Sequence, residues 1–293
     1  MKVRESRGRR AFTGINALLL ILIGLCCLMP MMHVLWCSIS DPVRLMRDQG
    51  FRVLPFFPLN FSGYQSVLAY RNILVGYSNT LIYVAMGTII NLVLTTVAAY
   101  VLSRKRFMPR NGIMLFMAFT MLFNGGMIPN YLLVRSLGIL DNRLAILLPA
   151  AFSVFNLVIM RTAFAQIPDS LDESARLDGA SEMQVLVWII IPVSMATIAV
   201  IALFVAIMFW NSWFTASIYL QDRDMWPLQM FMREILITTS QRSLDSGVRA
   251  SMVAQQTLIK YSTIIVATVP ILCVYPFVQK YFVKGIMLGS IKG

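Results

Sequence analysis

Charged residues are scarce in this sequence, and their scarcity excludes a soluble globular protein. Only 13% of the 293 residues are Asp, Glu, Lys or Arg, whereas soluble domains carry about 25%. Hydrophobic residues make up 58% of the chain, and the mean hydropathy is +0.73. This composition is typical of a protein that crosses a membrane several times.

Histidine and cysteine, two residue types common in catalytic and metal sites, are also rare, with one and four copies. The single histidine, His33, lies in an apolar run beside Met31 and Met32, where a packed or interfacial residue is favoured over a ligand. No G-x-x-x-x-G-K-[ST] loop is present, so the chain cannot cradle nucleotide phosphates by itself. The four cysteines show no metal-ligand spacing. The sequence therefore predicts no catalysis, no cofactor and no metal in this chain.

Long apolar stretches account for most of the sequence. A helix crosses the hydrocarbon layer with about 20 mostly apolar residues. The first stretch follows "MKVRESRGRR" like a signal peptide, but it runs on through "MPMMHVLW" without a small-x-small cleavage site, so we expect a retained helix. We predict six spans, at about 15–38, 77–102, 113–133, 144–165, 188–210 and 261–282.

These spans predict an all-α, polytopic membrane protein. Neither a linker nor a repeat divides the sequence, so residues 1–293 are expected to form one transmembrane domain embedded in lipid. Lys and Arg gather in the cytoplasmic segments of membrane proteins. The basic N-terminus and the "SRKR" cluster at 103–106 therefore place both termini in the cytoplasm, together with the segment 165–187.

The segment 165–187 holds the densest acidic cluster of a strongly basic chain. A charged side chain at the bilayer centre costs roughly 2.5–3.5 kcal/mol, so this segment must lie outside the hydrocarbon. Ser170 with Glu173, and Ser181 with Gln184, have the spacing of capping boxes, and Gly179 falls between them. The pattern favours two short helices joined by a glycine over a plain solvated loop.

One spacing within this segment carries a family resemblance. The stretch resembles the EAA signature of permease subunits in binding-protein-dependent ABC importers, which reads Glu-Ala-Ala, three residues, Gly, nine residues, Ile-x-Leu-Pro. Ser174 replaces the first Ala of that signature, and Ile191 replaces its Leu. The positions that match are Glu173, Ala175, Gly179, Ile189 and Pro192.

Further stretches resemble sugar permeases similar to the G subunit of the maltose importer. They are "NGGMIPNYLLVRSLGILDNRLAILLP" (124–149), "WNSWFTASIYL" (210–220), "WPLQMFMREIL" (226–236) and "YPFVQKYFVKGIMLGSIKG" (275–293). The forms "GGMIP" and "KGIMLGSIKG" are similar to the subgroup for oligosaccharides and oligo-uronates, which includes alginate and aldouronate importers. The resemblance implies a permease subunit in a bacterial cytoplasmic (inner) membrane that forms half of an oligosaccharide path.

The resemblance also assigns roles to residues of the segment 165–187. In the family this loop forms coupling helices that dock into a cytoplasmic ATPase dimer, which binds the ATP and Mg²⁺. Glu173 would make the polar contact, with Asp178 as a second one, and Ala175 would keep the docking face small. Gly179 would allow the turn, and Pro192 would set the angle of the following helix. Lys292, in the tail, would also reach the ATPase.

The sequence supports candidate residues for the substrate path less strongly than it supports those of the segment 165–187. Asn156, Asn211 and Trp213 are polar or aromatic residues within or beside spans and could line the path. Hydrogen bonding between helices and the interfacial aromatic belt explain such residues equally well. The long outer loop 211–260 either contacts an extracytoplasmic substrate-binding protein or packs on the bundle.

Partners follow from the same resemblance, because a six-span permease needs a second homologous permease subunit to close a path. No nucleic acid partner is expected. Two alternatives remain: an ion-driven secondary transporter, and a membrane enzyme that acts on lipid-linked sugar. A secondary transporter would require buried carboxylates within its spans, and a membrane enzyme would require acid–base or metal-binding residues at the lipid boundary. The sequence offers neither.

Overall fold

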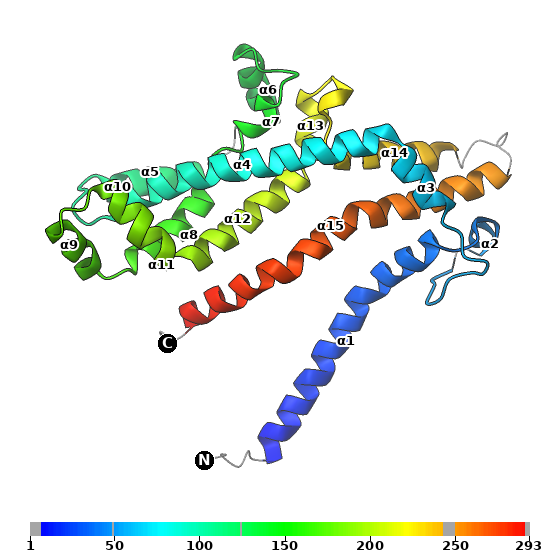
Figure 1. The fold of residues 1–293 in the computed structure, drawn as a ribbon, viewed down its shortest axis with the longest axis horizontal. Helices are drawn as coiled ribbons and strands as arrows, with labels where there is room; N and C mark the ends of the chain where they lie inside the picture. Colours follow the sequence, from blue (N-terminus) through cyan, green and yellow to red (C-terminus); the bar gives the residue numbers. More distant parts are fainter. Residues whose placement is uncertain (1–6, 49, 124, 243–249, 291–293) are drawn as a thin grey trace. The chain divides into compact units, whose positions relative to one another are not determined.

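The structure, a computed structural model, describes residues 7–48, 50–123, 125–242 and 250–290, and the regular structure in these ranges is helical (Figure 1). The chain folds into two units. Unit 1 comprises Met1–Tyr70 and Glu234–Val269, and unit 2 comprises Arg71–Arg233 and Pro270–Gly293. Helices α14 (Leu228–Arg242) and α15 (Ala250–Ser290) contribute residues to both units.

Unit 1 is held together by close packing and by hydroxyl hydrogen bonds. Its own helices are α1 (Arg7–Ser38), α2 (Pro42–Arg47) and α3 (Ser62–Ala69). Gly63 of α3 lies so close to Ser262 and Leu258 of α15 that an added Cβ would clash with both. The hydroxyl groups of Ser38 and Tyr64 lie 2.6 Å apart, and Ser262 donates to the carbonyl of Ser38.

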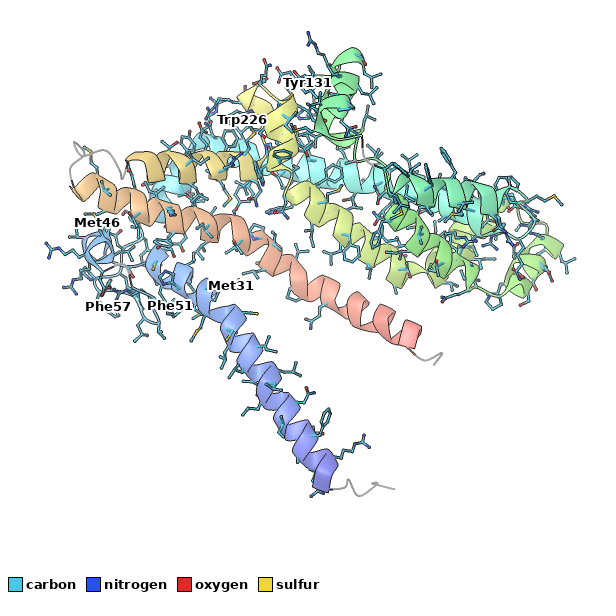
Figure 2. All side chains as sticks on the ribbon, turned by 180° about the vertical axis from the view of Figure 1, so that it is seen from behind. Met31, Met46, Phe51, Phe57, Tyr131 and Trp226 are labelled. Carbon is cyan, nitrogen blue, oxygen red and sulfur yellow. The ribbon has the colours of Figure 1, made fainter. Side chains whose placement is uncertain are left out.

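His33 is part of this packing. Its Nδ1 accepts a hydrogen bond from the backbone N–H of Arg52 at 3.0 Å. Its ring stacks on Phe51, one of the aromatic residues labelled in Figure 2, with 5.1 Å between the ring centroids. His33 therefore holds the loop after α2 against α1.

Unit 2 is built around α4 (Arg71–Ser103), a helix of 33 residues. The other helices and turns of the unit are α5 (Arg110–Thr120), α6 (Met127–Ser136), α7 (Leu144–Leu147), α8 (Val154–Ala165), α9 (Asp169–Leu177), α10 (Glu182–Val185), the π-helical turn η1 (Leu186–Ile190), α11 (Ile191–Val193), α12 (Met195–Trp210), α13 (Trp213–Tyr219) and the 3₁₀ turn η2 (Arg223–Met225). Helix α4 has no proline and no charged residue after Arg71, so nothing interrupts it.

Helices α8 and α12 lie along α4 and form the core of unit 2 (Figure 1). The buried core includes Tyr83 of α4, Phe164 of α8 and Phe209 of α12. Gly87 lets the Phe209 ring approach the backbone of α4, because a Cβ at this position would overlap the ring. The absence of a side chain at residue 87 therefore sets how closely α12 packs on α4.

Long apolar helices confirm part of the predicted set of spans. Three helical stretches are long and apolar enough to cross a membrane: Gly8–Ser38, Arg71–Ser103 and Met252–Val274. A fourth is added if the bent pair Glu182–Val193 and Met195–Trp210 counts as one span. The first, second and sixth predicted spans thus correspond to long helices within the described residues.

The third and fourth predicted spans differ from the expectation, since neither is one continuous helix. The stretch 113–133 is divided between α5 and α6, because Gly126 adopts a φ of 85°. The stretch 144–165 is divided between α7 and α8, because Pro149 cannot donate a helical hydrogen bond and Ser153 caps the start of α8.

The fifth predicted span, 188–210, contains a sharp bend. The axes of Glu182–Val193 and Met195–Trp210 differ by 83°. The π-helical turn η1 precedes Pro192, and the N–H of Ser194 contacts the carbonyls of Ile190 and Ile191 at 3.0 and 3.2 Å. A π-turn followed by a proline is a recognised cause of such bends. The bend is centred at Ser194, two residues after Pro192, and the angle-setting role of Pro192 stays a prediction.

Replacing Gly87 with alanine tests the close packing of α4 and α12. We expect the Gly87→Ala protein to lose about 1–3 kcal/mol of stability, because the new Cβ displaces the Phe209 ring. The measurement is thermal unfolding of the purified protein in detergent. Gly112→Ala, in α5, is the matched control, since a Cβ there meets nothing within 4 Å. Equal melting temperatures for the two variants would contradict this packing.

Candidate functional site

The acidic segment between α8 and α12 contains two short helices, α9 and α10, with a turn at Gly179 between them. Gly179 follows α9 with a φ of 83°. Its N–H donates to the carbonyl of Arg176 at 3.0 Å, and the N–H of Ala180 donates to the carbonyl of Ala175 at 2.9 Å. These two bonds form a Schellman motif, which ends a helix with a residue in the left-handed region. The glycine turn between two helices is confirmed.

Of the two predicted capping boxes, one is confirmed and one is wrong. The hydroxyl of Ser181 accepts from the N–H of Gln184 at 3.4 Å, and the Gln184 side chain accepts from the N–H of Ser181 at 2.8 Å. The box expected at Ser170 is missing, because α9 already begins at Asp169 and Pro168 occupies its cap position. Ser170 therefore lies inside the first turn and cannot cap it.

The acidic segment provides the counterions of the basic cluster that follows α4. The ammonium group of Lys105 lies 2.6 Å from Asp169, and Nη1 of Arg104 lies 3.6 Å from Asp172. Arg104 and Asp172 are the more buried pair, with side chains 10% and 15% exposed. Exposed pairs contribute about 0–1 kcal/mol, so we expect the Lys105 pair to contribute little to the attachment of α9.

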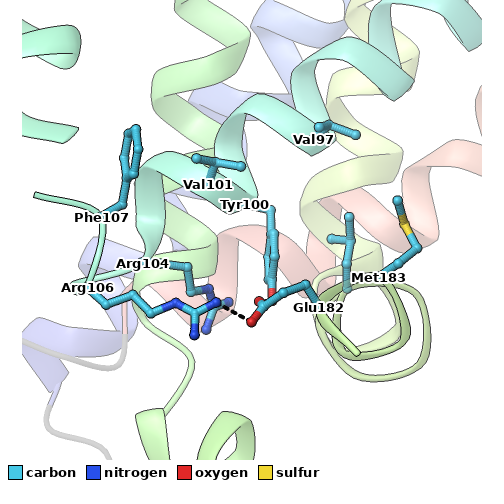
Figure 3. Close-up of a pocket in the computed structure, with 9 residues that line it drawn as sticks. Val97, Tyr100, Val101, Arg104, Arg106, Phe107, Glu182 and Met183 are labelled. Atoms are coloured by element: carbon cyan, nitrogen blue, oxygen red, sulfur yellow. Dashed lines mark hydrogen bonds and ion pairs between the residues drawn. The ribbon is translucent and has the colours of Figure 1, made fainter. Parts of the chain in front are cut away.

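Glu182, at the start of α10, is the centre of this network. Its carboxylate accepts hydrogen bonds from the Tyr100 hydroxyl at 2.7 Å and from Arg176 at 2.9 Å. Arg106 forms a further ion pair with it (Figure 3). Arg176 also pairs with Asp172 at 3.1 Å, which links the whole set. We call these residues the Glu182 network: Tyr100, Arg104, Arg106, Asp172, Arg176 and Glu182.

The network changes the acidity of its carboxylates. Burial raises the pKa of Glu182, but hydrogen bonds from Tyr100, Arg176 and Arg106 outweigh burial, so the pKa lies below its ordinary value. The hydrogen bond and the charge of Lys105 likewise lower the pKa of Asp169. Both carboxylates are therefore ionised at neutral pH and hold their partners.

The residues to which the resemblance assigns roles in this segment differ in burial. Glu173, Asp178 and Gly179 are exposed. Ala175 is only 8% exposed and belongs to the core of unit 2, so its small side chain serves the packing of α9 within this chain. Ile189 packs partly on the same core, whereas Pro192 is exposed.

Sequence reasoning missed one residue on the exposed face. Leu177, in the last turn of α9, is 89% exposed. It stands between the exposed Asp178 and the half-buried Arg176. A leucine flanked by charged residues at the end of a short helix was the available signal. Together Glu173 and Leu177 form a surface with one charge and one apolar side chain, which is suited to contact with another protein.

The three candidates for the substrate path are not joined to each other. Asn156 is 6% exposed in the first turn of α8, and Asn211 is exposed at the end of α12, where it donates to the carbonyl of Ile207. The guanidinium of Arg233 lies 4.0 Å from the centroid of the half-buried Trp213 ring. Within the described ranges no hydrogen bond connects the three. Their roles stay predictions, and Lys292 lies outside the described residues.

The other end of α4 carries a set of polar contacts that sequence reasoning missed as a group. The side chain of Asn79 donates to the carbonyls of Asp224 and Trp226 at 2.7 and 3.1 Å. Tyr83 donates to the carbonyl of Met225 at 2.7 Å, and Arg143 donates to Asn79 at 2.9 Å. These contacts fix the turn around η2 on α4.

Helix α13, just before this turn, is fixed by a separate contact. The rings of Tyr131 and Tyr219 stack with 6.3 Å between their centroids, and Tyr131 is labelled in Figure 2. This stack joins α6 to α13 in unit 2. Residues 213–228 therefore form an ordered part of this unit.

No protein-family model matches the sequence. The chain is 39% identical over 278 residues to the polygalacturonan/rhamnogalacturonan transport system permease protein YtcP of Bacillus subtilis, covering 94% of this chain and 96% of that protein. It is 36% identical over 293 residues to protein LplC of the same organism, covering 99% and 98%. The trehalose/maltose transport system permease protein MalG of Thermococcus litoralis is 26% identical, covering 99% of this chain and all (100%) of that protein.

A solved structure is similar over nearly the whole chain. It is the crystal structure of a bacterial ABC transporter involved in the import of the acidic polysaccharide alginate. One of its chains has 34% sequence identity and a TM-score of 0.84, covering 96% of this chain and 100% of that one. The resemblance to sugar permeases is thus confirmed.

The lowered pKa of Glu182 predicts a pH-dependent contribution to stability. Because the folded pKa is depressed, the contribution is full above about pH 4.3, the ordinary value for Glu, and is lost as the pH falls through the depressed value. We expect Glu182→Gln to melt below wild type at pH 7 and to approach it near pH 3. The measurement is thermal unfolding in detergent across this range.

The control for this prediction is Glu173→Gln, because Glu173 is exposed and lies outside the network. Its melting temperature should follow that of wild type at every pH. If Glu182→Gln also followed wild type from pH 7 to pH 3, the network would contribute nothing to the attachment of α9.

Proposed function

Because the chain belongs to the family of ABC transporter permeases, we propose that it forms half of the path by which an importer takes in an acidic oligosaccharide. The observation that carries the proposal is the match, over 96% of the chain, to a transporter involved in alginate import. The relative YtcP is named for polygalacturonan, which is also a uronate polymer. Two acidic polymers among the most similar relatives favour an anionic substrate over a neutral one.

In this proposal the chain crosses a bacterial cytoplasmic membrane six times with both termini inside. The long helices α1 and α4, the stretch Met252–Val274 and the bent pair provide four crossings. The divided stretches 113–133 and 144–165 provide the other two, each as two helical pieces. The Glu182 network supports a place for α9 outside the hydrocarbon, because its charges cannot enter it.

Helix α9 is the part that would meet the ATPase dimer. Its exposed face carries Glu173 and Leu177. Its opposite face is held by Ala175 in the core and by Asp172 and Arg176 in the network. A force on the exposed face would therefore pass to α4 through ion pairs and packing, and not through a free loop.

The remaining partners complete the importer. A second homologous permease would close the path, and the ATPase dimer would bind ATP and Mg²⁺. An extracytoplasmic binding protein would deliver substrate, with the ordered residues 213–228 as its contact on this chain. The cytoplasmic tail with Lys292 would add a second contact to the ATPase.

Two substitutions on the exposed face of α9 test coupling. We expect Glu173→Lys and Leu177→Asp each to lower ATP-dependent uptake roughly tenfold, the effect of losing about 1.4 kcal/mol of docking energy. The subunit should still insert, since neither side chain is part of the core. The measurements are uptake and ATP hydrolysis in proteoliposomes that hold the copurified subunits.

Ser174→Ala is the matched control, because Ser174 is an exposed residue of the same helix and alanine stands there in the family motif. It should import at the wild-type rate. Wild-type uptake by both Glu173→Lys and Leu177→Asp would refute docking through α9. An ion gradient that drives uptake without ATP would instead favour a secondary transporter.

The substrate class is tested with oligosaccharides of equal length. We expect saturable uptake of a labelled trigalacturonate or trimannuronate when the binding protein is present, and no uptake of maltotriose. Import of maltotriose alone would overturn the acidic assignment and leave the permease role intact.

A further inference from the structure

Two adjoining hollows lie along the end of α4 that carries the Glu182 network, within unit 2. The first has a volume of about 460 Å³ and is bordered by Tyr100, Arg104, Arg106, Glu182 and Met183 (Figure 3). The second has a volume of about 400 Å³, and all of its lining side chains are apolar. The two share Val97, Val101 and Phe107. We call them together the α4 groove.

The groove has the dimensions of one membrane leaflet. Its apolar part follows α4 from Val93 to Leu102. Nine steps of 1.5 Å make this part about 14 Å long. One leaflet contributes about half of the roughly 30 Å hydrocarbon layer. An apolar channel of this length, open along a helix that can cross a membrane, matches an acyl chain.

Cationic groups stand where the apolar part ends. Arg104 borders the groove with a side chain that is only 10% exposed. Its Nη1 lies near Asp172 and its guanidinium lies 4.5 Å from the centroid of the Tyr100 ring, but its Nε and Nη2 are buried without a hydrogen-bond partner. Buried N–H groups without partners are costly, and a guanidinium binds phosphate oxygens well.

One negative charge also borders the groove, and it is already compensated. Glu182 is paired with Arg106 and Arg176 and accepts from the Tyr100 hydroxyl. Arg104 therefore brings buried donors without a partner to this end of the groove. A ligand that fits has a long apolar tail and an anionic head.

We propose that the α4 groove binds an anionic phospholipid, with one acyl chain along Val93–Leu102 and the phosphate at Arg104. The proposal rests on the proposed function, whose orientation places this end of α4 in the cytoplasmic leaflet, where anionic lipids attract juxtamembrane basic groups. The bound lipid adjoins the Glu182 network. It therefore stabilises the same end of α4 that holds α9.

Native mass spectrometry tests the proposal on the full-length chain with its copurified subunits. The delipidated sample receives equal amounts of phosphatidylglycerol and phosphatidylcholine with identical acyl chains. We expect wild type to retain phosphatidylglycerol preferentially. Arg104→Gln should lower the ratio of the two bound lipids about fivefold, the effect of one basic group at an anionic surface. Val97→Trp, which fills the groove and leaves every charge in place, should lower phosphatidylglycerol occupancy similarly.

Two matched controls accompany these variants. Arg135→Gln removes an exposed arginine of α6, and Leu81→Trp adds the same ring on α4 at an exposed position outside both hollows. Both should behave like wild type.

Two results would overturn the proposal. They are equal retention of the two lipids by wild type, and a phosphatidylglycerol preference that survives both Arg104→Gln and Val97→Trp. Lipid retention is read from mass alone, so its failure is distinguishable from a failure of uptake.

Discussion

The pairing of the acidic segment with the basic end of α4 is the constraint on which the rest of this structure depends. Neither charge set can enter hydrocarbon, and each would repel itself without the other. The Glu182 carboxylate accepts from Tyr100 and Arg176 and pairs with Arg106, so a helix of nine residues is held against a long one. The acidic residues of the segment 165–187 thus have a structural role. They neutralise the cations at the end of α4.

This attachment gives α9 one face that packs on the chain and one face that is exposed. Ala175 and Asp172 face the chain itself, while Glu173 and Leu177 face outward. The chain turns at Gly179 and bends by 83° before α12, so α9 and α12 are joined by a turn and a sharp bend.

Polar contacts hold both ends of α4. At one end the contacts are ion pairs, and at the other Asn79, Thr80 and Tyr83 bond to the backbone of residues 224–228. Between these ends the α4 groove leaves apolar surface open. These contacts tie one end of α4 to the acidic segment and the other end to the turn around η2.

Local chemistry could be read directly from the sequence. Apolar length predicted α1 and α4, and the left-handed preference of glycine predicted the turn at Gly179. The Ser181 capping box depends on residues three apart, so it too was visible. The division of the stretch 144–165 was also local, since Pro149 and the Ser153 cap stand in the sequence. Tertiary structure decided the partners of Glu182 and the inward face of Ala175. Both depend on groups distant in the chain, and periodicity carries no information about such groups.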